Sequence, residues 1–493
     1  MMKHLFTFLT LLLAGSLTLS AQSKVWTAVV DFDGNVDNVT QLAQIDAAIP
    51  GDGMALVTFD GTCISSVGDH IILAASNDGD WHINSGAVDV EANPNQEEHS
   101  FSHSRFYPVS AGTHSFYAVA QAYIETAGDG NAQIVGLLTV KFFPSGSDMI
   151  FAGTEIEQEG VNLRGAPVTL AQLTINPGMS GTAIVHFDGV CFSTPGDLIV
   201  LAASDTPSWN FFDDNVPVEA IDNDYNAWSF SHTRAYDIGA GTHTFYAVGQ
   251  NFAMMDGDGI AYIYGTLTVE FIPDMYAPDV IPAFTGIINS ADPSVNTEIA
   301  SVSITAAEAG TTVVTFDGNA EPDDFLLLGA SNQTYLQSFG VGVSPYDELI
   351  NFMPFSHSQA YAVSAGMHSF YATGATTFGS STATCNVYGS LKATYVSDDV
   401  SVSTKEVQRL AQSVEVFPNP TADLARVHLG EVKGIQYIQL LNSEGKVLQR
   451  FEPQTAEQSG YLDVNLQARP AGTYYLQIVT NDRMSISKKI TRQ

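Results

Sequence analysis

Basic side chains are scarce in this sequence. Only 18 Lys+Arg stand against 53 Asp+Glu, which gives a formal net charge of −35 at pH 7. Charged residues make up 14% of the chain, below the usual quarter, and Thr, Ser, Gly, Val and Ala take their place, as is typical of β-proteins. A chain this negative repels phosphate backbones, which argues against nucleic-acid binding.

Cysteine and long apolar runs are also nearly missing. Three cysteines cannot form a disulfide framework, so we expect Cys63 and Cys191, which occupy matching places in two repeats, to be small buried residues; Cys385 has no such counterpart. After the first twenty residues no apolar run reaches the ~18 residues of a membrane helix. The sequence therefore predicts no transmembrane segment in the mature chain.

The N-terminus is typical of a secretory leader. Lys3 supplies a basic start, residues 5–14 form a short apolar stretch, and small residues follow. We expect residues 1–21 to be a signal peptide cleaved after Ala21. The mature protein is then secreted or lies on the outer cell surface, by way of the periplasm.

Charge divides the mature chain into two parts. Residues 401–493 carry 11 basic and 9 acidic side chains, whereas residues 22–400 carry 6 basic and 44 acidic, a net charge of −38. We read this mainly as a solvated acidic surface that favours solubility.

The acidic part is a tandem repeat. Four strings recur in one order at offsets of 124 to 129 residues: VTFDGTC, VHFDGVC and VTFDGNA; HIILAAS, LIVLAAS and FLLLGAS; FSHSRFYPVSAGTHSFYAV, FSHTRAYDIGAGTHTFYAV and FSHSQAYAVSAGMHSFYAT; GLLTVKF, GTLTVEF and GSLKATY. This pattern predicts three domains over residues 22–145, 146–274 and 275–398, either as beads on a string or as one threefold body.

Each repeat reads as β-structure. The strings are apolar and β-branched runs broken by Gly, Asp and Asn. About eight strands per copy predict an all-β protein with three tandem antiparallel β-sandwich repeats, possibly jelly rolls. We expect a hairpin with strands 101–109 and 114–120, and turns at the Asp residues of the FDG strings.

The last eighty residues form a different unit. After a linker at residues 399–411, residues 412–493 read as a small immunoglobulin-like β-sandwich. FPNPT at 417–421, LLNSEGKVL at 440–448, PAGTYYLQI at 470–478 and the terminal SKKITRQ resemble the type A C-terminal sorting domain of the type IX secretion system of Bacteroidota. Its motif residues are Pro418, Asn419, Pro420, Gly445, Gly472, Tyr474, Lys488 and Lys489.

The resemblance implies an export route and a set of partners. They are the type IX secretion machinery, the surface protease that removes the tail, and a surface lipopolysaccharide to which the cargo is joined unless it is released. The linker is the expected cleavage segment. The resemblance implies nothing about the acidic repeats.

One row of side chains in the repeats is a candidate ligand site. A strand with period two puts a Phe-His-Arg-Tyr row on one face, and such a row suits a sugar ring, an anionic group or a protein ligand. Its residues are Phe101, His103, Arg105 and Tyr107, then Phe230, His232, Arg234 and Tyr236. Gln359 replaces the arginine in the third copy. The alternative is an inner sandwich face, with the histidines packed in the core.

Calcium is the only cofactor that the sequence offers. Asp31, Asp33, Asn35 and Asp37 have a D-x-D-x-N-x-D spacing that can surround one hard cation, although Val36 and Leu42 break the helical calcium-loop pattern.

No catalytic motif is found in the chain, and a repeated module gains avidity where an enzyme gains little. We therefore expect no enzyme, but a secreted or cell-surface adhesin, binder or coat protein. The alternative is a secreted glycan-active enzyme, with carboxylates in loops such as 77–99 and 205–227, or a polysaccharide-binding accessory protein.

Overall fold

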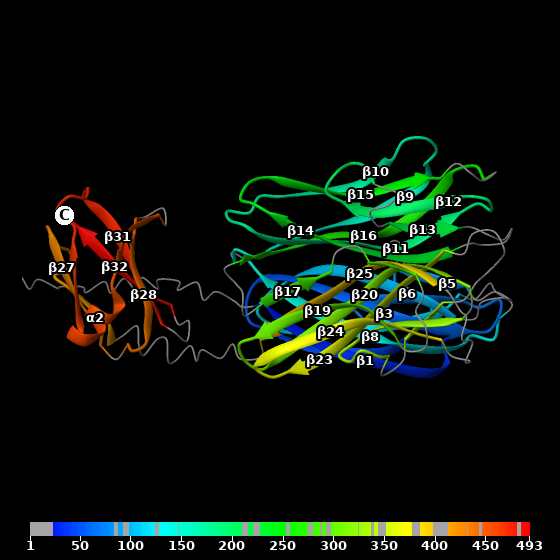
Figure 1. Ribbon diagram of the computed structural model, residues 1–493, viewed down its shortest axis with the longest axis horizontal. Helices are drawn as coiled ribbons and strands as arrows, with labels where there is room; N and C mark the ends of the chain where they lie inside the picture. Colours follow the sequence, from blue (N-terminus) through cyan, green and yellow to red (C-terminus); the bar gives the residue numbers. More distant parts are fainter. Residues whose placement is uncertain are drawn as a thin grey trace, which may run out of the picture. The chain divides into compact units, whose positions relative to one another are not determined.

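The computed structural model describes residues 23–82, 87–91, 98–123, 128–145, 147–209, 215–219, 227–252, 257–274, 280–285, 288–291, 297–323, 325–336, 340–343, 352–376, 385–397, 413–430, 432–442, 446–480 and 485–493. The predicted leader and linker lie outside these residues. The chain divides into two compact units, residues 1–398, called the body, and 399–493, called the tail domain, and each is described by itself (Figure 1). No helix in the part of the chain that the structure describes is long and apolar enough to cross a membrane.

The first repeat is a sandwich of eight strands. They are β1 (Lys24–Asn35), β2 (Thr40–Ile49), β3 (Gly53–Ser65), β4 (His70–Ser76), β5 (Val88–Glu91), β6 (Glu98–Val109), β7 (Gly112–Ala122) and β8 (Asn131–Pro144). One sheet has the order β1-β8-β3-β6 and the other β2-β7-β4-β5. Strand one pairs with eight, two with seven, three with six and four with five, which is the nested antiparallel pairing of a jelly roll.

The second and third repeats follow the same plan. The second has β9 (Ile150–Asn162), β10 (Val168–Ile175), β11 (Gly181–Ser193), β12 (Leu198–Ser204), β13 (Val216–Glu219), β14 (Ala227–Ile238), β15 (His243–Asn251) and β16 (Ile260–Pro273). The third has β17 (Val280–Phe284), β18 (Ile288–Ala291), β19 (Thr297–Ala306), β20 (Gly310–Pro322), β21 (Leu326–Ser331), β22 (Val341–Val343), β23 (Met353–Val363), β24 (Gly366–Thr376) and β25 (Cys385–Ser397). β17 and β18 together take the place of the first strand, because both pair with β25. The all-β prediction, with three sandwiches of jelly-roll type, is confirmed.

Alternating side chains build each core. Phe59 and Phe101 are fully buried between the two sheets of repeat 1, with ring centroids 4.7 Å apart and the rings edge to face. The same pair recurs as Phe187 with Phe230, and as Phe316 with Phe355. Burying one such ring contributes about 1.5–3 kcal/mol. Cys63, Cys191 and Cys385 are free and buried, as expected for the first two.

The predicted hairpin over residues 101–120 does not form. β6 pairs with β3, whereas β7 pairs with β2 and β4. The turn between them therefore carries the chain from one sheet to the other. The alternation was sufficient to find both strands, but nested pairing overrides sequence proximity.

The FDG strings are strand interiors, so their prediction as turns is wrong. Asp60, Asp188 and Asp317 lie within β3, β11 and β20. Their glycines face a second glycine across the sheet: Gly189 opposes Gly265 in β16. A Cβ atom on Gly189 would lie 2.1 Å from the carbonyl oxygen of Tyr264. Glycine is required here by close backbone approach.

The three repeats close into one ring. Strands β6, β14 and β23, which hold the FSHS-type strings, contact one another. β6 also packs on β11 and β16 of repeat 2, β14 on β20 and β25 of repeat 3, and β23 on β3 and β8 of repeat 1. Each repeat thus packs against the next, and the third packs against the first. The body is a pseudo-threefold trimer made from one chain, not beads on a string.

One end of the pseudo-threefold axis gathers the joints between repeats. Met149, Ile184, Ile272 and Val396 form an apolar cluster, with Val25 packed against it. These residues lie near the start of β1, the two inter-repeat connections and the end of β25. The chain therefore enters the body, crosses between repeats and leaves the body at the same end.

The tail domain is a seven-stranded sandwich with one short helix. Its elements are β26 (Glu415–Phe417), β27 (Leu424–His428), β28 (Ile435–Leu441), β29 (Val447–Phe451), α2 (Pro453–Ser459), β30 (Tyr461–Asn465), β31 (Gly472–Thr480) and β32 (Ser485–Arg492). The sheets have the orders β26-β27-β30 and β29-β28-β31-β32. The sandwich is confirmed, while α2 has no counterpart in the sequence prediction.

Candidate functional site

The predicted Phe-His-Arg-Tyr row faces the sandwich interior. Phe101 and Phe230 are core residues, and His103 and His232 are 2% exposed. His103 Nδ1 accepts a hydrogen bond of 2.9 Å from the backbone N–H of Ala75 in the opposite sheet, and His232 and His357 do the same with Ala203 and Ala330. The Phe and His members are therefore unavailable to a ligand. The inner-face alternative describes them, because each histidine joins the two sheets of its own repeat.

The arginines and tyrosines of the row have contacts of a different kind. Arg105 forms an ion pair of 2.9 Å with Glu155 in β9, so it ties repeat 1 to repeat 2. Arg234 holds the same position in β14 and is half-buried. Tyr107 packs on Phe116 with ring centroids 6.0 Å apart. Of the eight residues in the row, Tyr236 is one that lines a cavity.

The predicted calcium ligands do not converge. Asp31, Asp33 and Asn35 point outward from the extended strand β1, so successive members are about 7 Å apart along the chain at ~3.3 Å per residue. A calcium ion holds its oxygens at about 2.3–2.6 Å. Asn35 is also engaged, since its Oδ1 accepts from the N–H of Asp37 and its Nδ2 donates to the Asp129 carbonyl. Here the spacing belongs to one exposed face of an extended strand.

A cluster of buried carboxylates surrounds the pseudo-threefold axis. Each of Asp60, Asp188 and Asp317 is at most 5% exposed. Ser102 donates to Asp60 over 2.6 Å and to Asp188 over 3.4 Å. Ser231 donates to Asp317, and Ser358 to Asp60. Every carboxylate thus accepts a hydroxyl hydrogen bond from the preceding repeat in the ring.

Sequence analysis missed this axis cluster. The signal was present, since an Asp recurs between two β-branched runs and a hydroxyl residue alternates with Phe and His in the FSHS strings. Without the fold, the aspartates read as turns and the hydroxyls as an exposed face. The hydrogen bonds between these hydroxyls and carboxylates show that the aspartates serve to join the repeats.

The axis also carries charges that differ among the repeats. Lys141 Nζ lies 3.3 Å from both carboxylate oxygens of Glu270, with the Glu270 side chain buried and that of Lys141 12% exposed. Burial alone would raise the pKa of Glu270, but the Lys141 and Lys392 charges hold it below its ordinary value. The ion pair therefore joins β8 of repeat 1 to β16 of repeat 2, where the equivalent residue of repeat 3 is the neutral Thr394.

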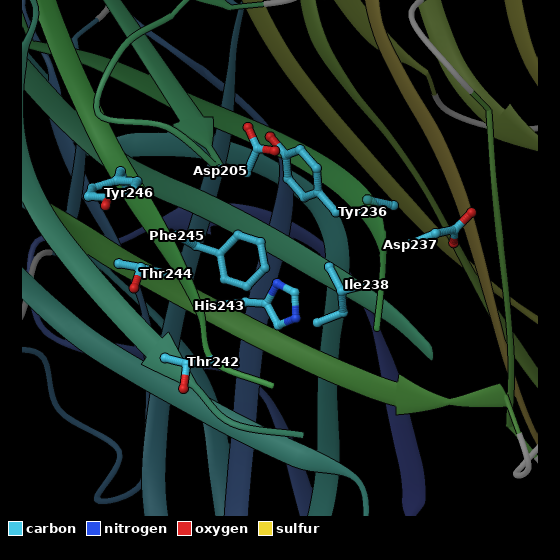
Figure 2. Close-up of a pocket in the computed structure, with 10 residues that line it drawn as sticks. Asp205, Tyr236, Asp237, Ile238, Thr242, His243, Thr244, Phe245 and Tyr246 are labelled. Atoms are coloured by element: carbon cyan, nitrogen blue, oxygen red, sulfur yellow. The ribbon is translucent and has the colours of Figure 1, made fainter. Parts of the chain in front are cut away.

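One cavity of about 540 Å³ opens in repeat 2, where β14 ends and β15 begins (Figure 2). We call it the β14–β15 pocket. It is lined by Asp205, Ala235, Tyr236, Asp237, Ile238, Thr242, His243, Thr244, Phe245 and Tyr246. The Tyr236 and Phe245 rings pack with centroids 5.6 Å apart, and Asp205 lies beside the hydroxyl end of Tyr236 (Figure 2). Sequence analysis had named Tyr236 and the loop that begins at residue 205.

Three polar side chains of the pocket are hydrogen-bonded within the protein. His243 Nε2 is within 2.9 Å of the Gly239 carbonyl oxygen, which occupies that ring nitrogen. Thr244 Oγ1 is bonded to Thr174 Oγ1 over 3.0 Å, and Asp237 Oδ1 accepts from Thr182 over 3.3 Å. The exposed lining of the pocket is mainly polar, with the buried Phe245 ring behind it, so the pocket is suited to holding a ligand chiefly by hydrogen bonds.

In the tail domain the recognised motifs meet in space. Asn419 Nδ2 donates to the Lys489 carbonyl oxygen over 2.8 Å, and Asn419 Oδ1 accepts from the N–H of Thr491. The FPNPT motif therefore clamps the terminal strand, and both of its X–Pro peptide bonds, before Pro418 and Pro420, are cis. Tyr474 is buried and its hydroxyl donates to the Pro470 carbonyl oxygen.

The remaining motif residues have lesser roles. Gly472 begins β31. Lys488 lies in β32, and burial lowers its pKa. Gly445 lies outside the described residues.

These observations define an all-β protein with a single-chain trimeric body and a small sandwich at its C-terminal side. Residues 415–493 match the family model described as "Secretion system C-terminal sorting domain". The tail domain belongs to that family, which confirms the resemblance read from its motifs. It marks the chain for export by the type IX secretion system and implies contact with that machinery and a secreted or outer-surface location.

Two solved viral structures match part of the chain, with low similarity. The chain is similar to a structure titled "The Triple Jelly Roll Fold and Turret Assembly in an Archaeal Virus", with 10% identity, a TM-score of 0.18, and coverage of 76% of this chain and 90% of that one. It is also similar to infectious bursal disease virus Gx strain, with 9% identity, a TM-score of 0.16, and coverage of 76% and 80%. Likenesses this low carry no argument about function. A comparison with curated proteins gives no match.

Proposed function

We propose that this protein is a non-catalytic surface protein, exported through its tail domain, whose body serves as a binding or coat module. The leader takes the chain to the periplasm, the surface protease removes the tail domain, and the body is joined to lipopolysaccharide or released. The observation that carries the proposal is the sorting-domain match at residues 415–493.

The body supports the non-catalytic part of the proposal. Its repeated polar residues serve structure: the histidines of the FSHS strings join sheets, and the aspartates at the axis join repeats. Among the residues that the structure describes, the exposed acidic side chains and the β14–β15 pocket are available to a partner. Such a surface suits display and ligand retention.

Deletion of residues 415–493 tests export. We expect the full chain on the cell surface or in the medium, and the truncated chain inside the cell. Resistance of the truncated body to limited proteolysis is the control, because it separates loss of sorting from loss of folding. Normal surface delivery of the truncated chain would refute the proposal.

Incubation with a polysaccharide panel tests the non-catalytic role. Retention of the protein without release of reducing ends supports a binder. Turnover of any polysaccharide would instead support the glycan-active enzyme, with Asp205 as the first carboxylate to substitute.

A further inference from the structure

The β14–β15 pocket differs from the equivalent places in the other two repeats. Asp205 is replaced by Asn77 in repeat 1 and Asn332 in repeat 3. Ala235 is replaced in repeat 1 by Phe106, whose ring packs on Phe151 with centroids 5.8 Å apart. Repeat 3 keeps a small residue there, but Met367 replaces Thr242. Only repeat 2 combines a carboxylate, a small neighbour and a hydroxyl at this place.

The chemistry of the lining defines the ligand. Tyr236 and Ile238 are partly exposed in the pocket, with the buried Phe245 ring behind Tyr236, and Asp205 lies beside the Tyr236 hydroxyl (Figure 2). Neither lysine nor arginine is among the lining residues, and the sequence around them carries a charge of −38 over residues 22–400. The net charge of this part of the chain therefore disfavours an anionic ligand, although Arg234 lies in the same row as Tyr236. A carboxylate accepts strong hydrogen bonds from hydroxyl groups, and an aromatic ring packs on the C–H face of a ligand ring.

We propose that the β14–β15 pocket is a binding site for a neutral sugar ring. Asp205 accepts hydrogen bonds from the sugar hydroxyls, and Tyr236 supplies both a ring edge and a hydroxyl. This pocket makes repeat 2 the binding repeat, while repeats 1 and 3 complete the ring. This inference rests on the proposed role as a surface binding module and names its ligand class.

Calorimetric titration of the exported protein, purified from the cell surface or the medium, tests the site. The probes are cellobiose, maltose and mannobiose, with glucuronic acid as the anionic comparison. We expect at least one neutral disaccharide to bind at one site per chain, and Asp205→Asn to weaken its Kd about tenfold through loss of a charge-assisted hydrogen bond. Asn already occupies this position in repeats 1 and 3, so the variant is expected to fold. Tyr236→Phe removes only the hydroxyl and is expected to weaken binding as well.

Asp46→Asn is the matched control. It removes one carboxylate from the exposed face of β2 in repeat 1, so it changes net charge equally and leaves the pocket untouched. Binding that Asp205→Asn and Asp46→Asn alter equally, tighter binding of glucuronic acid, or no binding of any neutral disaccharide overturns the inference. Export is scored in the same cultures: surface protein without sugar binding refutes the site alone, whereas protein retained inside the cell refutes the proposed function.

Discussion

His186 is one residue at which the axis departs from its own symmetry. Its Nδ1 is bonded to Thr233 Oγ1 over 2.8 Å, and its Nε2 lies 3.6 Å from Asp188 Oδ2. Asp317 is 4.0 Å away. Burial alone would lower the pKa of His186, but the Asp188 charge raises it above its ordinary value overall, although Lys392 opposes this.

This histidine gives the body a pH-dependent stability. A group whose pKa is raised on folding stabilises the fold fully below its ordinary pKa, and that stability is lost as pH rises through the folded value. We expect the unfolding temperature of the body to fall by a few degrees between about pH 6 and pH 8. His186→Thr, the residue at equivalent positions 58 and 315, should flatten this slope in thermal unfolding monitored by circular dichroism. An unchanged slope in the variant would contradict the assignment.

Individual residues also show where the sequence was insufficient. The alternation around His103 placed it correctly on one face with Phe101, but it left open whether that face was a groove or a core. The nested pairing places β6 opposite β4 rather than beside β7, and this arrangement puts His103 in the core. The D-x-D-x-N spacing did not lead to a cation site, because an extended strand holds apart the side chains that a turn would bring together.

At the scale of strands, the Lys141–Glu270 pair fixes one repeat against another. Lys141→Glu places two carboxylates together in a buried site, and we expect a loss of about 3–5 kcal/mol in unfolding free energy. Exchange of both residues, Lys141→Glu with Glu270→Lys, should recover most of it. Chemical denaturation of both variants measures the effect, with exposed Lys446→Glu in the tail domain as control.

No recovery in the double variant would mean that the pair does not act as a unit. Recovery above the native stability is not expected, because Lys392 remains near both positions.

The facing glycines give a second test of strand packing. Gly189→Ala must displace the backbone of β16, because the added Cβ would meet the Tyr264 carbonyl oxygen. We expect loss of at least a few kcal/mol, or no folded protein. Gly178→Ala in the same repeat has no heavy atom within 4 Å of its added Cβ and should melt as the native protein does. Equal melting of the two variants would show that β11 and β16 can separate without cost.

For the whole molecule, sequence repetition predicted three sandwiches, and motifs predicted the sorting function of the tail. The closed ring was not predictable, because its evidence lies in contacts between positions such as Ser358 and Asp60, which are 298 residues apart. Local patterns report which residues are buried within one sandwich. They do not report which hydroxyl meets which carboxylate across three sandwiches.

The apolar cluster that brings together the start of β1 and the end of β25 gives the body two distinct ends. The chain leaves the body after β25, at the end where the inter-repeat joints gather. Loops 66–69 and 194–197, which follow β3 and β11, lie at the far ends of those strands. These loops and the exit of the chain therefore lie at opposite ends of the body.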